Sequence, residues 1–95
     1  MPLLEITRIV WLEDIVEKLL WKHGVEEWEV IEVMESRPKF IFKEPGHRLG
    51  EDVYAAFGRT IAGRYMSVFF VYTRDGRAIV VSARDMSDKE REKYG

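Results

Sequence analysis

Cysteine is absent from the 95-residue sequence, and histidine occurs only twice. Without cysteine the chain can form neither a disulfide nor a catalytic thiolate, and such a composition suits a reducing cytoplasm. His23 and His47 do not have the spacing of metal ligands, so a zinc site would need carboxylates to complete it. We therefore expect no metal and no cofactor.

The sequence also lacks long apolar runs and the common nucleotide-binding and nucleophile motifs. No apolar run approaches the length of a membrane span, and GxGxxG, P-loop, GxSxG and HExxH motifs are all missing. Residues 1–11 carry no cationic segment ahead of an apolar block. We therefore expect no secretion signal, no membrane contact and a cytoplasmic location.

The length and the charge limit the possibilities further. Ninety-five residues, 46% of them hydrophobic, fit one folded domain over residues 1–95. A net charge of −2 is not typical of a general nucleic-acid binder, because such proteins usually carry a positive field that attracts phosphates. Binding of that kind would require cations to be segregated on part of the surface.

Helical periodicity dominates the first third of the chain. Apolar residues recur at spacings of three and four from Leu12 to Leu20, which predicts an amphipathic helix docked on a sheet, with Gly24 as its left-handed stop. A second helix is expected over residues 25–36. Its acidic outer face fits solvation or, less commonly, a basic protein partner. Ser87 and Glu90 form a capping box that predicts a short final helix.

Strand-forming residues dominate residues 52–85, which we expect to form antiparallel strands at 52–60, 64–73 and 77–84. Asp75-Gly76 is a hairpin signal that favours a turn in which both residues have positive φ. Shorter strands are expected at residues 4–12 and 37–43. The predicted fold is α+β, with the order β-α-α-β-β-β-β-α and a twisted, mainly antiparallel sheet that has its helices packed on one face.

The expected strand ends carry four arginines: Arg59, Arg64, Arg77 and Arg84. A rigid sheet can present such side chains to a ligand, although charges at strand ends also serve to keep a sheet soluble. On the helical wheel His23 falls within the apolar stripe and Trp21 on the solvent side. His23 therefore fits either a functional role or that of a cap for the last carbonyl groups of its helix.

The other polar candidates are Lys22, His47, Glu51 and Tyr72. Together with the arginines they suit RNA cleavage by the substrate's own 2′-hydroxyl, which needs a base, cations for the phosphorane and an acid for the departing 5′-oxygen. Composition alone allows a plain binding module equally well.

An ordered series of short motifs extends this interpretation, and over residues 9–94 the chain resembles the BrnT toxin family. The motifs are Trp21-Lys22-His23-Gly24-Val25, a Pro/Gly loop with His47 and Glu51, Phe57-Gly58-Arg59, Gly63-Arg64, Val71-Tyr72-Thr73, Val81-Ser82-Ala83-Arg84 and a charged final segment ending in Tyr94. Members commonly place Ser or Thr after KHGV, where this chain has Glu26.

The resemblance implies a RelE-like fold of the RelE/ParE-like superfamily and a metal-independent ribonuclease that arrests translation. It also implies a small antitoxin with a ribbon-helix-helix domain, through which alone the complex would contact DNA and repress its operon. We expect His23 or Glu51 as base, His23, Lys22 or Tyr72 as acid, and Arg59, Arg64 and Arg84 on the phosphate. His47 and Arg77 are expected to bind RNA. The alternative is a catalytically inactive module that binds the antitoxin within a repressor complex.

Overall fold

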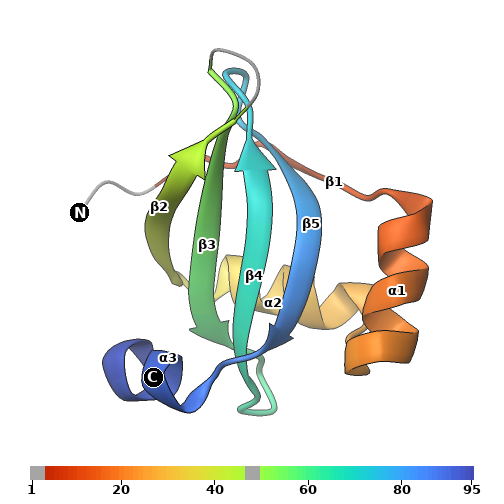
Figure 1. Ribbon diagram of the computed structural model, residues 1–95, viewed down its shortest axis with the longest axis vertical. Helices are drawn as coiled ribbons and strands as arrows, with labels where there is room; N and C mark the ends of the chain where they lie inside the picture. Colours follow the sequence, from red (N-terminus) through yellow and green to blue (C-terminus); the bar gives the residue numbers. More distant parts are fainter. Residues whose placement is uncertain (1–3, 47–49) are drawn as a thin grey trace.

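A computed structural model describes residues 4–46 and 50–95 of the protein. Its elements, in chain order, are β1 (Arg8–Val10), α1 (Glu13–His23), α2 (Glu27–Glu35), β2 (Lys39–Pro45), β3 (Asp52–Arg59), β4 (Tyr65–Tyr72), β5 (Arg77–Asp85) and α3 (Asp88–Tyr94). The predicted α+β class and element order are confirmed (Figure 1). None of the described helices is long and apolar enough to cross a membrane.

The five strands form one sheet in the order β1-β5-β4-β3-β2. All neighbours are antiparallel except β1, which runs parallel to β5. We call the end of the sheet that holds Arg59, Tyr65 and Asp85 the lower end, and the end that holds Asp52 and Arg77 the upper end, as they stand in Figure 1. This register decides which predicted site residues can meet.

Alternation along the strands gives the sheet two different faces. The helix face packs on α1 and α2, and its buried strand residues are Ala56, Met66, Val68, Phe70, Ala78, Val80 and Ala83. The residues between them point to the opposite face, which we call the open face. Its side chains at the lower end are Phe57, Arg59, Tyr65, Ser67, Phe69 and Arg84.

Helix α1 follows the predicted pattern. Leu19 is buried in the core, Ile15 packs against it, and Trp21 on the opposite side is 76% exposed. Gly24 ends the helix at φ 63°, a left-handed conformation that costs glycine little, and its N–H bonds to the carbonyls of Leu19 and Leu20. The stop signal that was predicted from the sequence is confirmed.

Helix α2 begins two residues later than predicted because Glu26 itself caps it. The Glu26 side chain accepts from the backbone of Glu29, and the Glu29 side chain accepts from the backbone of Glu26. A glutamate therefore makes the reciprocal cap that Ser or Thr usually provides. Val30 and Val33 are completely buried against the sheet.

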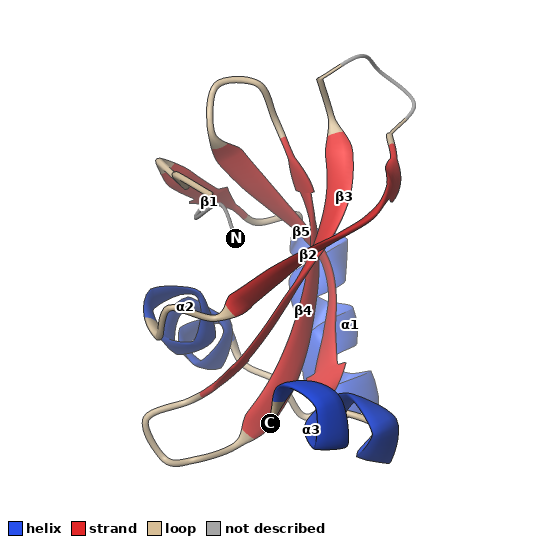
Figure 2. Ribbon diagram, turned by 90° about the vertical axis from the view of Figure 1, so that its left-hand side faces the viewer, coloured by secondary structure: helices blue, strands red, loops and turns tan. Residues whose placement is uncertain are grey.

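Helix α3 lies on the open face, across the lower end of the sheet from α2 (Figures 1 and 2). The Ser87–Glu90 capping box starts the helix, as predicted. The Tyr94 ring then stacks on the Phe57 ring at 4.1 Å. Phe57 is apolar and belongs to the open face, and α3 shields it from solvent there. The helices therefore lie on both faces of the sheet and not on one face as predicted.

Two local predictions need correction. The hairpin between β4 and β5 forms at the predicted place, but Gly76 has positive φ and Asp75 does not. Gly76 donates to the Thr73 carbonyl and Thr73 to the Arg77 carbonyl, so the loop has three residues instead of the predicted two-residue turn. The first strand covers only Arg8–Val10, because its pairing with β5 extends no further.

Candidate functional site

The structure divides the predicted site residues between the two ends of the sheet. Arg59 pairs with Tyr65 at the lower end, whereas Tyr72 pairs with Asp52 at the upper end. Seven residues of an antiparallel strand separate Tyr65 from Tyr72, which is about 24 Å. Tyr72 also belongs to the helix face, where it packs against the core. The structure therefore does not bring Tyr72 and Arg59 together.

The upper end holds a small cavity of about 300 Å³, lined by Gly50, Glu51, Thr73, Arg74, Asp75 and Arg77. Arg77 is paired with Asp75 at 3.1 Å, and hydrogen bonds from Thr73 and then from Arg77 lower the pKa of the Asp75 carboxyl. The Tyr72 hydroxyl donates to the Glu5 carbonyl at 2.9 Å. His47 lies outside the described residues. At this end Glu51 and Arg77 line one cavity.

At the lower end Arg64 joins three parts of the fold. Its guanidinium donates to Asp85 at 2.6 Å, to Glu29 at 3.0 Å and to the carbonyls of His23 and Gly24 at 3.1 and 3.0 Å. The hydrogen bond to Asp85 and the one to Glu29 raise the pKa of Arg64. Arg64 thus caps the last carbonyls of α1, the role that His23 could have had.

Lys22 and His23 form the last turn of α1. Lys22 is exposed and His23 is half-buried. The Lys22 ammonium group suits the negative end of the helix dipole. Since Arg64 binds the backbone carbonyl of His23 and the Asp85 carboxylate, one side chain connects the C-terminal end of α1 to the end of β5.

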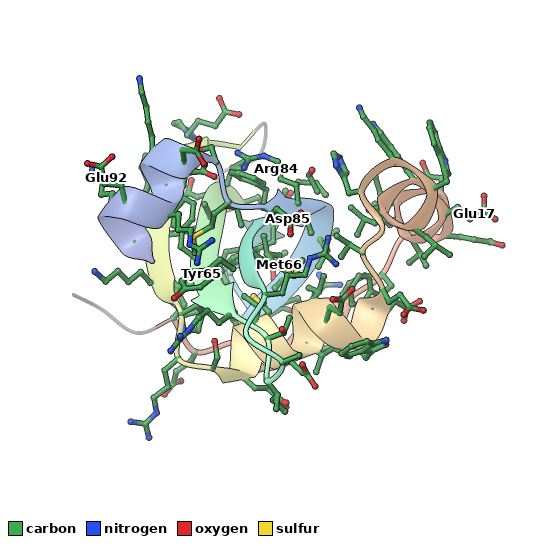
Figure 3. The ribbon with its side chains drawn as sticks, turned by 90° about the horizontal axis from the view of Figure 1, so that it is seen from below. Glu17, Tyr65, Met66, Arg84, Asp85 and Glu92 are labelled. Carbon is green, nitrogen blue, oxygen red and sulfur yellow. The ribbon has the colours of Figure 1, made fainter. Side chains whose placement is uncertain are left out.

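Arg84 lies on the open face beside Asp85, between α3 and α1 (Figure 3). It forms a two-pronged ion pair with Glu90 of α3, at 2.6 and 2.9 Å, and its guanidinium lies 5.1 Å from the centre of the Phe69 ring. Glu90 also accepts from Ser67 at 2.9 Å. The pKa of Glu90 is lowered to about 2, and the hydrogen bond from the Arg84 guanidinium makes the largest contribution. The Glu90 carboxylate therefore occupies N–H donors of Arg84 that could otherwise bind a phosphate.

Arg59 has a different environment. It is exposed, and its guanidinium lies 5.3 Å from the centre of the Tyr65 ring, which also carries Arg91 of α3 at 4.1 Å. Its hydrogen bond to the Tyr65 hydroxyl is long, at 3.4 Å. Among the ion pairs of residues 4–46 and 50–95, neither Arg59 nor Arg91 takes part. Most of their N–H donors therefore face solvent.

A groove of about 860 Å³ runs past Arg59 around the lower end, from the end of α2 to the end of α3. Its cations are Arg37, Lys39 and Arg59, and its aromatic residues are Phe57, Tyr65 and Tyr94. Glu32 and Glu35 form the wall on the α2 side, where Glu32 accepts the backbone N–H of Ile61 at 3.0 Å. We call this feature the basic groove.

Of the residues that line the basic groove, the sequence predicts only Arg59 as a site residue. Arg37 and Lys39 follow α2 without any motif, and Tyr65 was assigned to an ordinary strand. One signal was available: Arg91 and Tyr94 are three residues apart on a helix and so share a face. That spacing shows that the two side chains act on one surface, but it does not show which strand lies beneath.

Comparison with known proteins agrees with this architecture. The family model described as "Ribonuclease toxin, BrnT, of type II toxin-antitoxin system" matches residues 11–90. The crystal structure of the Brucella abortus ribonuclease toxin BrnT superposes with a TM-score of 0.63 at 21% sequence identity, covering 85% of this chain and 97% of that one. At that identity the likeness concerns the fold. A comparison with curated protein sequences gave no match.

Proposed function

Because the chain belongs to the BrnT family of ribonuclease toxins of type II toxin–antitoxin systems, we propose that it cleaves RNA without a metal ion and thereby inhibits translation. Membership gives the chain RNA as its substrate and an antitoxin as its partner. The proposed reaction is attack of the substrate's 2′-hydroxyl on the adjacent phosphate. The O2′–P bond forms as the P–O5′ bond breaks, leaving a 2′,3′-cyclic phosphate and a 5′-hydroxyl.

The observation that supports this proposal is the shared position of Arg59 and Arg84. Both belong to the open face at the lower end, on the strands that flank Tyr65 and Ser67 of β4. Two strand spacings and two residues along β4 separate them, about 12 Å between Cα atoms, which long side chains can span around one phosphate. Two guanidinium groups would stabilise the extra charge of the phosphorane, with the phosphate taking the place of Glu90 on Arg84.

The proton transfers are assigned to the end of α1. His23 would take the proton of the 2′-hydroxyl, and Lys22 would protonate the departing 5′-oxygen. Arg64 would hold this helix end in place through the carbonyls of His23 and Gly24. Glu51, Tyr72 and Arg77 lie at the upper end, so the proposal gives them no part in the step at Arg59 and Arg84.

The test is cleavage of a short single-stranded RNA by the parent and by Arg59→Ala, Arg84→Ala and His23→Ala, with a chelator present. Each arginine variant should lose about 10² to 10³ in rate, by analogy with the removal of an oxyanion-hole donor. Arg74→Ala, an exposed cation of the upper end, is the matched control. A 2′-deoxy substrate should resist cleavage.

Parent rates for all three variants, loss of activity on chelation, or cleavage of the 2′-deoxy substrate would each overturn the proposed mechanism. The expected end groups give an independent check, since the proposed reaction leaves no 3′-hydroxyl.

A second candidate function is an inactive module that binds a ribbon-helix-helix antitoxin and acts in an autorepressor complex. The observation that favours it is the occupation of Arg64 and Arg84 by the protein's own carboxylates. Induced expression in cells separates the two candidates. Growth arrest supports the ribonuclease, whereas tight binding of the antitoxin without arrest supports the module.

A further inference from the structure

We propose that the basic groove binds the single-stranded RNA on one side of the cleavage point, through cations that aromatic rings hold in place and that carboxylates leave free. The inference rests on the proposed function, because it extends the substrate from Arg59 along the lower end. It assigns RNA contacts to residues of β2 and α3.

The cations around the groove are concentrated despite a net charge of −2. Six of them surround the rings of Phe57, Tyr65 and Tyr94, and none takes part in an ion pair between described residues. They are Arg37, Lys39, Lys43, Arg59, Arg91 and Lys93. The segregated cations that a negatively charged RNA-binding protein requires are therefore found here.

Four of these six cations lie over aromatic rings. Lys43 is 5.6 Å from the centre of the Phe57 ring and Lys93 is 5.4 Å from that of Tyr94, while Arg59 and Arg91 share Tyr65. A ring attracts a cation through its face without accepting the N–H groups as a carboxylate does. The cations are thus positioned while their donors stay available for phosphate oxygens.

The acidic residues of α2 in the groove limit the path that the RNA strand can take. Glu32 and Glu35 repel phosphates, so the RNA backbone should keep to the cations Arg37, Lys39 and Arg59. Basic residues interleaved with aromatic rings are typical of surfaces that bind single-stranded nucleic acid with little dependence on sequence.

Arg37 offers a variant that separates RNA binding from stability. It has φ 57°, a left-handed conformation that disfavours every residue with a Cβ atom. Glycine adopts this conformation without that penalty, so Arg37→Gly should melt no lower than the parent. If Arg37 contacts phosphate, the same variant should bind RNA more weakly.

The experiment measures binding of a fluorescent single-stranded 2′-O-methyl oligoribonucleotide, which cannot be cleaved by 2′-hydroxyl attack, by anisotropy over a series of KCl concentrations. The variants are Arg37→Gly, Lys39→Ala, Lys93→Ala and their triple combination, with Arg74→Ala as control. The triple variant should lose at least about tenfold in affinity at low salt. Its salt slope should fall in magnitude by about 2, since each single-strand phosphate contact contributes about 0.7.

A second pair of variants tests the role of the ring. Tyr65→Leu keeps every charge but removes the face shared by Arg59 and Arg91, and it should weaken binding about two- to fivefold. Tyr65→Phe keeps the face and should bind as the parent does. Equal affinities for the two variants would contradict the part assigned to the ring.

The inference is overturned if the triple variant binds the oligonucleotide with the affinity and salt slope of Arg74→Ala. It is also overturned if the triple variant keeps RNA binding but no longer binds the antitoxin, because the groove would then be a protein interface. Since the probe cannot react, a wrong cleavage mechanism would leave this result unchanged, and the two proposals can fail separately.

Discussion

The two sides of the lower end hold their arginines in opposite ways. On the β5 side, Arg64 and Arg84 donate to carboxylates and carbonyls of the protein itself. On the β3 side, Arg59 shares the Tyr65 ring with Arg91 and has no carboxylate partner among the described residues. The partner of an arginine, and not its place at a strand end, therefore decides whether its N–H donors are available to a substrate in this structure.

The largest difference in stability is expected for Arg64→Ala. It removes hydrogen bonds to Asp85, Glu29 and the carbonyls of α1 and leaves the Glu29 carboxylate buried without a cation. We expect the free energy of unfolding in urea to fall by about 2–3 kcal/mol. Arg59→Ala, on the other side, should change it by less than about 0.5 kcal/mol. Equal losses for both variants would remove the distinction between the two sides.

A smaller effect is expected where α3 meets the sheet. Tyr94→Ala removes the ring that stacks on Phe57 and uncovers that buried residue. The free energy of unfolding should fall by about 1–2 kcal/mol, and trypsin should cleave α3 at Lys89 or Arg91 faster than in the parent. Tyr94→Phe keeps the stacked pair and serves as control. Unchanged proteolysis of Tyr94→Ala would show that Arg84 and Glu90 hold the helix alone.

The Arg84–Glu90 pair should appear in the pH dependence of stability. The folded pKa of Glu90, about 2, lies below its ordinary value of 4.5, so the pair stabilises the fold above about pH 4.5 and this contribution is lost as the pH falls through about 2. The loss should be no more than about 1 kcal/mol, because the pair is partly solvated. Denaturation series of the parent and of Glu90→Gln should therefore converge on acidification.

The smallest effect is expected at the upper end. Arg77 is paired with exposed Asp75 in a tight loop, far from the basic groove. Arg77→Ala should match the parent in thermal melting and in RNA binding, although sequence analysis named Arg77 as an RNA contact. A loss of RNA affinity as large as that of Lys39→Ala would extend the RNA path to both ends of the sheet.

The elements of this fold could be predicted from the sequence because each depends on neighbours within a few residues. The spacing of Leu12, Ile15 and Leu19 marks α1, Gly24 ends it, and Ser87 with Glu90 starts α3. The errors within these elements were equally local. Glu26 replaced the usual cap, and a three-residue loop replaced the two-residue turn at Gly76.

The candidate site depended on tertiary structure. Arg64 meets Glu29 and the end of α1 across 35 to 41 residues, and Arg59 meets Arg91 only because α3 folds over Tyr65. The sequence by itself determined the α+β order, the ends of the helices and the stock of cations, since these follow from short-range pattern and composition. Strand register and the docking of α3 decided which cations are occupied by carboxylates and which stay free, because those partners are distant along the chain.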